Sequence, residues 1–136
     1  RIRGHDRYTM KTERQRIGRN GEDEAARYLE GLGHTIVCRN WRNSHLELDI
    51  ISLCRNVLHI VEVKSRTAPA MAEPELNVNS SKRRRMVAAA GAFLGSDQRA
   101  LLPDDLEVFF DVLTVVFDGP DFDIEYYPQA FIPTYA

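Results

Sequence analysis

Two stretches of mostly apolar residues with strand-like alternation stand next to each other in the middle of the chain. They cover 46–53 and 57–63 and are separated only by residues 54–56. This spacing predicts two antiparallel β-strands joined by a hairpin. Comparable patterns predict further strands over 35–41, 107–117 and 122–127.

Helical spacing appears on either side of these strands. Over 12–32 it gives a stripe that we expect to be buried, formed by Ala25, Ala26, Leu29 and Leu32, with Gly31 and Gly33 at the helix end. Asn79-Ser80-Ser81 offers an N-cap for a second helix that runs to about residue 94 and ends at Gly95. The order α-β-β-β-α-β-β predicts an α+β fold (α/β in the broad sense) in which helices pack on a sheet.

The hairpin register decides which polar residues meet. If Arg55-Asn56 forms a two-residue turn, one face of the two strands carries these pairs: Asp49 with Glu62, Glu47 with Lys64, Ile51 with Ile60 and Leu53 with Leu58. Two facing carboxylates repel, and a divalent cation between them would remove the repulsion. A three-residue turn would shift the register by one and break the pattern.

Glu22 points the same way as the apolar stripe of the first helix, three residues before Ala25. A carboxylate on a buried stripe is costly unless it is paired or bound to metal. Two interpretations are open. Glu22 contributes to a metal site, or it lies in the first helical turn, stabilised by the helix dipole or by Arg19.

These motifs, in this order, resemble the YraN family of bacterial predicted nucleases. That family is placed in the PD-(D/E)xK, or restriction-endonuclease-like, superfamily and is related to archaeal Holliday-junction resolvases. The matching residues, spread over about 17–117, are Gly18, Gly21-Glu22, Ala25-Ala26, Tyr28-Leu29, Gly33, Arg39-Asn40-Trp41-Arg42, Glu47-Leu48-Asp49-Ile50-Ile51, Val61-Glu62-Val63-Lys64-Ser65-Arg66, Lys82 and Phe110-Asp111-Val112. The chain departs from the family at Leu46, where glycine is usual, and at Phe109, where arginine is usual.

The resemblance implies a restriction-endonuclease-like fold, with a central mixed sheet flanked by helices, and metal-dependent hydrolysis of phosphodiester bonds. A DNA endonuclease is expected, with branched structures among its substrates. The alternative is a protein on the same fold that binds nucleic acid or a partner without cutting. The expected catalytic residues are Glu22, Glu47, Asp49, Glu62 and Lys64.

Hard oxygen ligands suit Mg²⁺ or Mn²⁺, and Asp49, Glu62 and the Val63 carbonyl would provide them. The resemblance adds Glu22 to this metal set. Lys64 would orient the attacking water and stabilise the charge on the phosphorus. Glu47 would bind a second ion or hold Lys64.

Basic residues are unevenly distributed. Residues 1–100 hold 18 Lys and Arg against 12 Asp and Glu, a balance of +6, whereas 101–136 hold none against 8, a balance of −8. We expect nucleic acid, most naturally DNA, to contact the residues Arg19, Arg39, Arg42, Arg66, Lys82, Arg83, Arg84 and Arg85. For any single run, a solvated helix face is the alternative.

Length and composition predict one nuclease-like domain over 11–136, with residues 1–10 as a tag or disordered extension. Cys38 and Cys54 are too few for a disulfide framework, which favours the cytoplasm, and no membrane-spanning run is present. A homodimer is open, with Tyr126, Tyr127 and Phe131 as its candidate surface.

Two further residues have open roles. Trp41 would pack at the core edge or stack on a base. Asp111 would hydrogen-bond the backbone or hold Lys82. The cysteines and histidines lack the spacing of zinc ligands.

Overall fold

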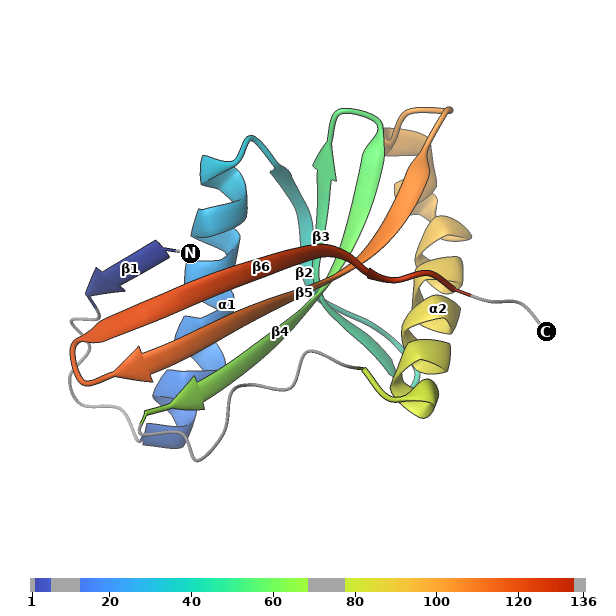
Figure 1. The fold of residues 1–136 in the computed structure, drawn as a ribbon. Coiled ribbons are helices and arrows are strands. Elements are labelled where there is room, and N and C mark those ends of the chain that lie inside the picture. The colour runs from blue at the N-terminus through green and yellow to red at the C-terminus, as the bar shows by residue number, and fades with distance from the viewer. Residues whose placement is uncertain (1, 6–12, 69–77, 134–136) are drawn as a thin grey trace.

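The computed structural model describes residues 2–5, 13–68 and 78–133, with side chains from residue 21 onward within these ranges. Its elements are β1 (Ile2–His5), α1 (Glu13–Gly31), β2 (Thr35–Asn43), β3 (Leu46–Cys54), β4 (Val57–Thr67), α2 (Ser80–Leu94), the 3₁₀ helix η1 (Asp97–Leu101), β5 (Glu107–Asp118) and β6 (Asp121–Phe131). The strands form a single sheet in the order β1-β6-β5-β4-β3-β2 (Figure 1). Among the strands that the structure describes, only β4 and β5 pair in parallel, so the sheet is mixed and the predicted α+β fold is confirmed.

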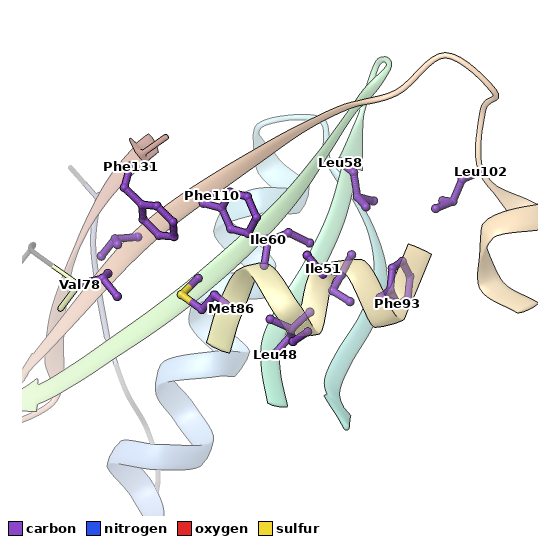
Figure 2. Close-up of a cluster of buried hydrophobic side chains, with 13 residues drawn as sticks. Leu48, Ile51, Leu58, Ile60, Val78, Met86, Phe93, Leu102, Phe110 and Phe131 are labelled. Carbon is purple, nitrogen blue, oxygen red and sulfur yellow. The ribbon is translucent and has the colours of Figure 1, made fainter. Parts of the chain in front are cut away.

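Two hydrophobic cores hold the helices against opposite faces of the sheet. Met86 and Phe93 of α2 pack toward Ile51 and Ile60, as Figure 2 shows. The small residues of α1 pack on the other face, against alternate residues of the same strands; this core contains Ala25, Ala26, Leu29, Ile50, Val61, Leu113 and Val115. Leu32, expected in the α1 stripe, is instead 49% exposed, because the helix ends at Gly31.

The predicted hairpin between β3 and β4 is confirmed near its turn. Cys54 pairs with Val57, and Arg55 takes the left-handed conformation that the tight turn requires, with φ of 58°. The ladder ends at Ile50 and Val61. The two predicted charged pairs, Asp49 with Glu62 and Glu47 with Lys64, therefore lie beyond the backbone ladder.

The N-terminal strand differs from the sequence-based expectation. Ile2–His5 forms β1 and pairs with the outer edge of β6 at 121–124, although residues 1–10 were expected to lie outside the fold. An edge strand exposes unpaired backbone N–H and C=O groups, and β1 provides partners for those of β6 at 121–124. Residues 6–10 lie outside the described ranges.

The C-terminal aromatic residues are not the exposed surface that was predicted. Phe131 is 8% exposed and stacks on Phe110 with ring centroids 5.0 Å apart. Tyr126 packs beside Tyr28 of α1. Phe131 is buried and Tyr126 is partly buried, so the structure gives no support to a dimer surface built on these two residues.

A buried polar network crosses the sheet near the β3–β4 turn. Asp111, fully buried, accepts from the Gln129 backbone N–H at 2.8 Å, lies 2.6 Å from His59 Nδ1 and accepts from the Tyr126 hydroxyl. His34 Nδ1 lies 2.8 Å from the Ser52 hydroxyl, and its ring is 4.5 Å from that of His59. Asp111 therefore bonds the backbone, the first of its two predicted roles.

Burial sets the titration of this network. It raises the pKa of Tyr126 well above the usual range, and the neighbouring Asp111 charge adds to the effect. Burial also lowers the pKa of His34, with His59 as the second cause. The network therefore links the residue just before β2 to β6, through groups that cannot be replaced one at a time without leaving a buried partner unsatisfied.

The structure describes no helix that is both long enough and apolar enough to cross a membrane.

Asp111→Ala should lower the free energy of unfolding by about 3–5 kcal/mol, because it leaves partners on β4 and β6 without their acceptor. Asp118→Ala, which removes an exposed carboxylate at the end of the same strand, should change it by about 0.5 kcal/mol or less. Urea denaturation followed by circular dichroism measures both. Equal effects of the two substitutions would contradict the structural role of the network.

Candidate functional site

Asp49 lies where the ladder between β3 and β4 ends. Its Oδ2 accepts a hydrogen bond of 2.9 Å from the backbone N–H of Val63, so a side chain replaces the backbone acceptor that a continuing strand would provide. Burial and, second, the charge of Glu62 together raise the pKa of Asp49 to about 7, against the lowering effect of the Val63 N–H. Asp49 is thus a carboxylate that lacks a sufficient counter-charge.

Glu62 is the second carboxylate of the pair. Its charge is the second cause of the raised pKa of Asp49, so the two carboxylates lie close enough to repel each other. Its Oε2 lies 3.5 Å from Nζ of Lys82, in the first turn of α2. The structure thus brings Asp49 and Glu62 together as predicted, and adds Lys82, which the sequence analysis had assigned to nucleic acid or to Asp111.

A bend in both β2 and β3 creates this position. Leu48 packs in the α2 core and Ile50 in the α1 core, although residues two apart in a regular strand share a face. On β2, Asn40 has φ of 53° and stands between the residues that pair with Leu48 and Ile50. The sheet therefore rotates at Asn40 and Asp49, which turns the Asp49 strand away from β4.

Glu22 approaches the pair from α1. It lies in the middle of the helix rather than in its first turn. Arg39 Nη2 lies 3.9 Å from its Oε1, and the Asn40 side chain is close enough to lower its pKa. Burial raises its pKa, and Asp49 is the second cause, ahead of Glu47. The structure excludes the first-turn position and puts Glu22 near the other carboxylates, while its part in a metal site stays a prediction and the side chain of Arg19 is not described.

Gly21 allows α1 to approach β4 this closely. A Cβ at this position would lie 1.9 Å from Oγ and 3.0 Å from Cβ of Ser65. Any side chain would therefore force the helix or Ser65 to move. The absence of a side chain at Gly21 sets the distance between Glu22 and the strand that carries Glu62.

Glu47 and Lys64 do not pair as predicted. Because β3 rotates at Asp49, Glu47 pairs across the β2–β3 hairpin with Arg42, whose Nη2 lies 3.5 Å from Glu47 Oε1. Glu47 still lies near enough to raise the pKa of Glu22. Within the described residues, Lys64 has no carboxylate at salt-bridge distance.

Apart from Arg19, whose side chain is not described, the predicted nucleic-acid contacts fall into two groups. Most of these cations already have protein partners: Arg39 with Asp23 at 2.7 Å, Arg42 with Glu47, Lys82 with Glu62, Arg83 with the Val78 carbonyl and the Phe131 ring, and Arg85 with Ser81. Arg66 and Arg84 are exposed and have no protein partner in the described part of the chain. Arg66 follows Glu62 and Lys64 at alternate positions of β4, on the same face by strand geometry.

The donor set suits a hard divalent ion, although it is sparse. No three His, Cys, Asp or Glu side chains within the described ranges converge closely enough to hold a metal. Asp49 and Glu62 do converge, and their repulsion is relieved by any cation between them. Mg²⁺ binds through one or two carboxylates and keeps several waters, so a pair of this kind is adequate.

The other candidates have structural roles. Trp41 meets Phe93 edge to face at 5.5 Å and packs on the α2 core, which confirms the core-edge interpretation. Asn79 caps α2 by accepting from the Lys82 N–H at 2.8 Å. The sequence analysis missed the Ser52–His59 pair, although both are polar residues at facing positions of the predicted hairpin.

Comparison with known proteins gives the family but no activity. The model of the uncharacterised protein family UPF0102 matches residues 21–115. A UPF0102 protein of Bacteroides thetaiotaomicron is 40% identical over 121 residues, which is 89% of this chain and 96% of the relative. A UPF0102 protein of Phocaeicola vulgatus is 39% identical over 89% of this chain and 96% of its own length. A UPF0102 protein of Nitratidesulfovibrio vulgaris is 37% identical over 87% of this chain and 85% of its own length.

The matched residues include the whole of the carboxylate site, from Gly21 to Lys64, and also Lys82 and Asp111. The resemblance to the YraN family is confirmed, because relatives named UPF0102 align with this chain over most of their length. This chain is a member of the uncharacterised protein family UPF0102.

Proposed function

We propose that the protein is a metal-dependent nuclease that hydrolyses phosphodiester bonds of DNA, with branched DNA among its substrates. The observation that carries the proposal is the pairing of Asp49 with Glu62 at the end of the β3–β4 ladder. Folding alone gives no reason to hold two carboxylates together beside an apolar core. A reaction that requires a divalent ion gives one.

The residues around the pair have complementary roles. Mg²⁺ or Mn²⁺ held by Asp49, Glu62 and the Val63 carbonyl would activate water and neutralise phosphoryl oxygens. Lys64 provides a positive charge that no described carboxylate neutralises, and it stabilises the charge that develops on the phosphate. Glu22 orients water at the side of the site that faces α1.

The free cations extend the site along β4. Lys64 and Arg66 lie on the same strand face as Glu62, so a backbone that places one phosphate at the carboxylates meets further positive charge along the strand. Arg84 adds a cation on α2. Phosphate contacts of this kind hold nucleic acid without reading its sequence, as expected for an enzyme that selects DNA by shape.

The ion pair between Lys82 and Glu62 favours a second candidate function. A lysine that neutralises the carboxylates permanently would leave a protein that binds nucleic acid without cutting it. The two functions differ in metal binding. Calorimetric titration with Mn²⁺ should give binding that is lost in Asp49→Ala for the nuclease, and no binding at all for the second candidate.

A cleavage panel tests the proposal directly. Single-stranded, duplex, flap and four-way DNA are incubated with Mg²⁺, Mn²⁺ or chelator, and the products are resolved by denaturing electrophoresis. The nuclease should cut at least one substrate only with metal, and Asp49→Ala and Glu62→Ala should abolish the products. Metal-dependent cutting that survives both substitutions would place the active site elsewhere.

The metal-free protein should lose stability as the pH rises. The pKa of Asp49 is about 7 in the fold against 3.8 ordinarily, so the folded state binds its proton more tightly than the unfolded state does. The proton on Asp49 therefore stabilises the fold fully below about pH 4, and this stabilisation is lost by about pH 7. The loss in the free energy of unfolding is on the order of 4 kcal/mol, at 1.36 kcal/mol per pKa unit. Urea denaturation in chelator at successive pH values measures it.

Asp49→Asn should flatten this part of the stability curve, because the amide does not titrate. Asp105→Asn, in the exposed segment before β5, serves as the control and should leave the curve unchanged. Parallel curves for Asp49→Asn and the parent protein would mean that Asp49 is ionised in the fold throughout this range.

Lys64→Met should separate binding from catalysis. Metal affinity should stay equal or increase, because a positive charge near the cation is removed. Cleavage should fall by roughly 10²-fold or more, the scale for losing one electrostatic stabiliser. Rates under saturating metal measure the effect, and a variant that cuts as fast as the parent would exclude Lys64 from the mechanism.

Arg66→Ala and Arg84→Ala should each reduce the salt dependence of duplex binding by roughly 0.9 in the slope of log K against log salt. Arg55→Ala, at the distant β3–β4 turn, should leave the slope unchanged. Fluorescence anisotropy in chelator measures all three. Unchanged slopes for both Arg66→Ala and Arg84→Ala would show that these cations only solvate the surface.

A further inference from the structure

The lysine beside the carboxylate pair comes from the helix and not from the strand motif. Lys82 Nζ lies 3.5 Å from Glu62 Oε2, with 34% of the Lys82 side chain and 17% of the Glu62 side chain exposed. Lys64, two residues after Glu62 on β4, has no such contact among the described side chains. The ammonium group that neutralises Glu62 thus comes from α2, on a flexible side chain that is free to move to another partner.

We propose that Lys82 is a built-in counterion that occupies the cation position beside Glu62 when no divalent ion is bound, and that moves to a phosphate of the nucleic acid when the ion enters. This inference rests on the proposed function and deepens it. Metal and nucleic acid then bind cooperatively through one side chain, which regulates when the site is assembled.

Competition for Glu62 is the first step of the argument. An ammonium ion and a divalent cation on the same carboxylate repel each other, so the binding of one weakens the binding of the other. The Lys82–Glu62 pair therefore opposes metal binding by the free energy of that pair, which for a partly exposed ion pair corresponds to roughly a fivefold change in affinity.

The surroundings of Lys82 determine where it goes. Its backbone is fixed, because Asn79 accepts from its N–H and caps the helix. The first turn of α2 contains no acidic residue, and Arg83, Arg84 and Arg85 follow directly. A displaced Lys82 therefore has no carboxylate on its own helix turn to pair with, whereas a phosphate at the site would take up its charge.

Linkage makes the consequence measurable. If nucleic acid gives the displaced Lys82 a new partner, it removes the competitor of the metal, and the metal in turn frees Lys82 for nucleic acid. Part of this coupling comes from direct contact between the metal and phosphate and does not depend on Lys82. The Lys82-dependent part should disappear in a neutral variant of the same size.

The experiment compares Mn²⁺ affinity by calorimetry for the full chain and for Lys82→Met, Lys82→Arg, Arg55→Gln and Asp49→Ala. Lys82→Met should bind Mn²⁺ roughly fivefold more tightly than the parent. Lys82→Arg, which keeps the charge, and Arg55→Gln, which removes a distant charge, should bind as the parent does. Equal affinity of Lys82→Met and the parent would overturn the inference and leave the nuclease proposal intact.

The Asp49→Ala titration distinguishes failure of the Lys82 inference from failure of the proposed nuclease function. Loss of Mn²⁺ binding in this variant supports the carboxylate site. Absence of binding in every protein, or binding that survives Asp49→Ala, would overturn the proposed function and the inference with it.

A second arm measures the coupling in a Lys64→Met background, which slows cleavage of the duplex. The factor by which duplex DNA strengthens Mn²⁺ binding should be roughly fivefold smaller when Lys82→Met is added. An unchanged factor would show that Lys82 does not move to the nucleic acid.

Discussion

The hydrogen bond from the Val63 N–H to the Asp49 carboxylate is the contact on which the rest of the site depends. At this point β3 leaves β4, and a partly buried backbone donor would otherwise be left without an acceptor. An unsatisfied donor of this kind costs about 1–3 kcal/mol, so the carboxylate stabilises the divergence of the strands. The same bond fixes Asp49 beside Glu62, so the position of the carboxylate pair depends on where the two strands separate.

The basic residues around the site are largely neutralised by acidic residues of the protein itself, which the amino-acid composition does not reveal. The first hundred residues carry an excess of basic residues, yet most of the described cations near the carboxylates are engaged by the protein itself. Arg39 is held by α1, Arg42 by the β2–β3 hairpin and Lys82 by Glu62. If the proposed function holds, a phosphate backbone would have to exchange these contacts for its own, in addition to meeting the cations that have no described partner.

The sequence predicted the elements well because their signals are local. Helical and strand periods, the Arg55 turn and the Asn79 cap all depend on neighbouring residues, and each is found in the structure. The meeting of Asp49 with Glu62 followed from extending the register of that hairpin.

The errors arose where the backbone departs from regularity. Alternation was extended past Asp49, but a left-handed Asn40 on the neighbouring strand rotates both β2 and β3, and Glu47 turns to Arg42 instead of Lys64. The burial of Phe131 and the pairing of β1 depend on segments distant in sequence. No local period contains that information.

The parallel pairing of β4 with β5 has a consequence for the order in which the site is assembled. β3 and β4 are joined by a two-residue turn, so Asp49 and Glu62 can meet through a short chain closure. β5 reaches β4 only after the chain has passed through α2, and contacts of such sequence separation form slowly. During folding the carboxylates should therefore meet before α2 brings its lysine, which leaves a short-lived hairpin whose negative charge is not yet compensated from within the chain.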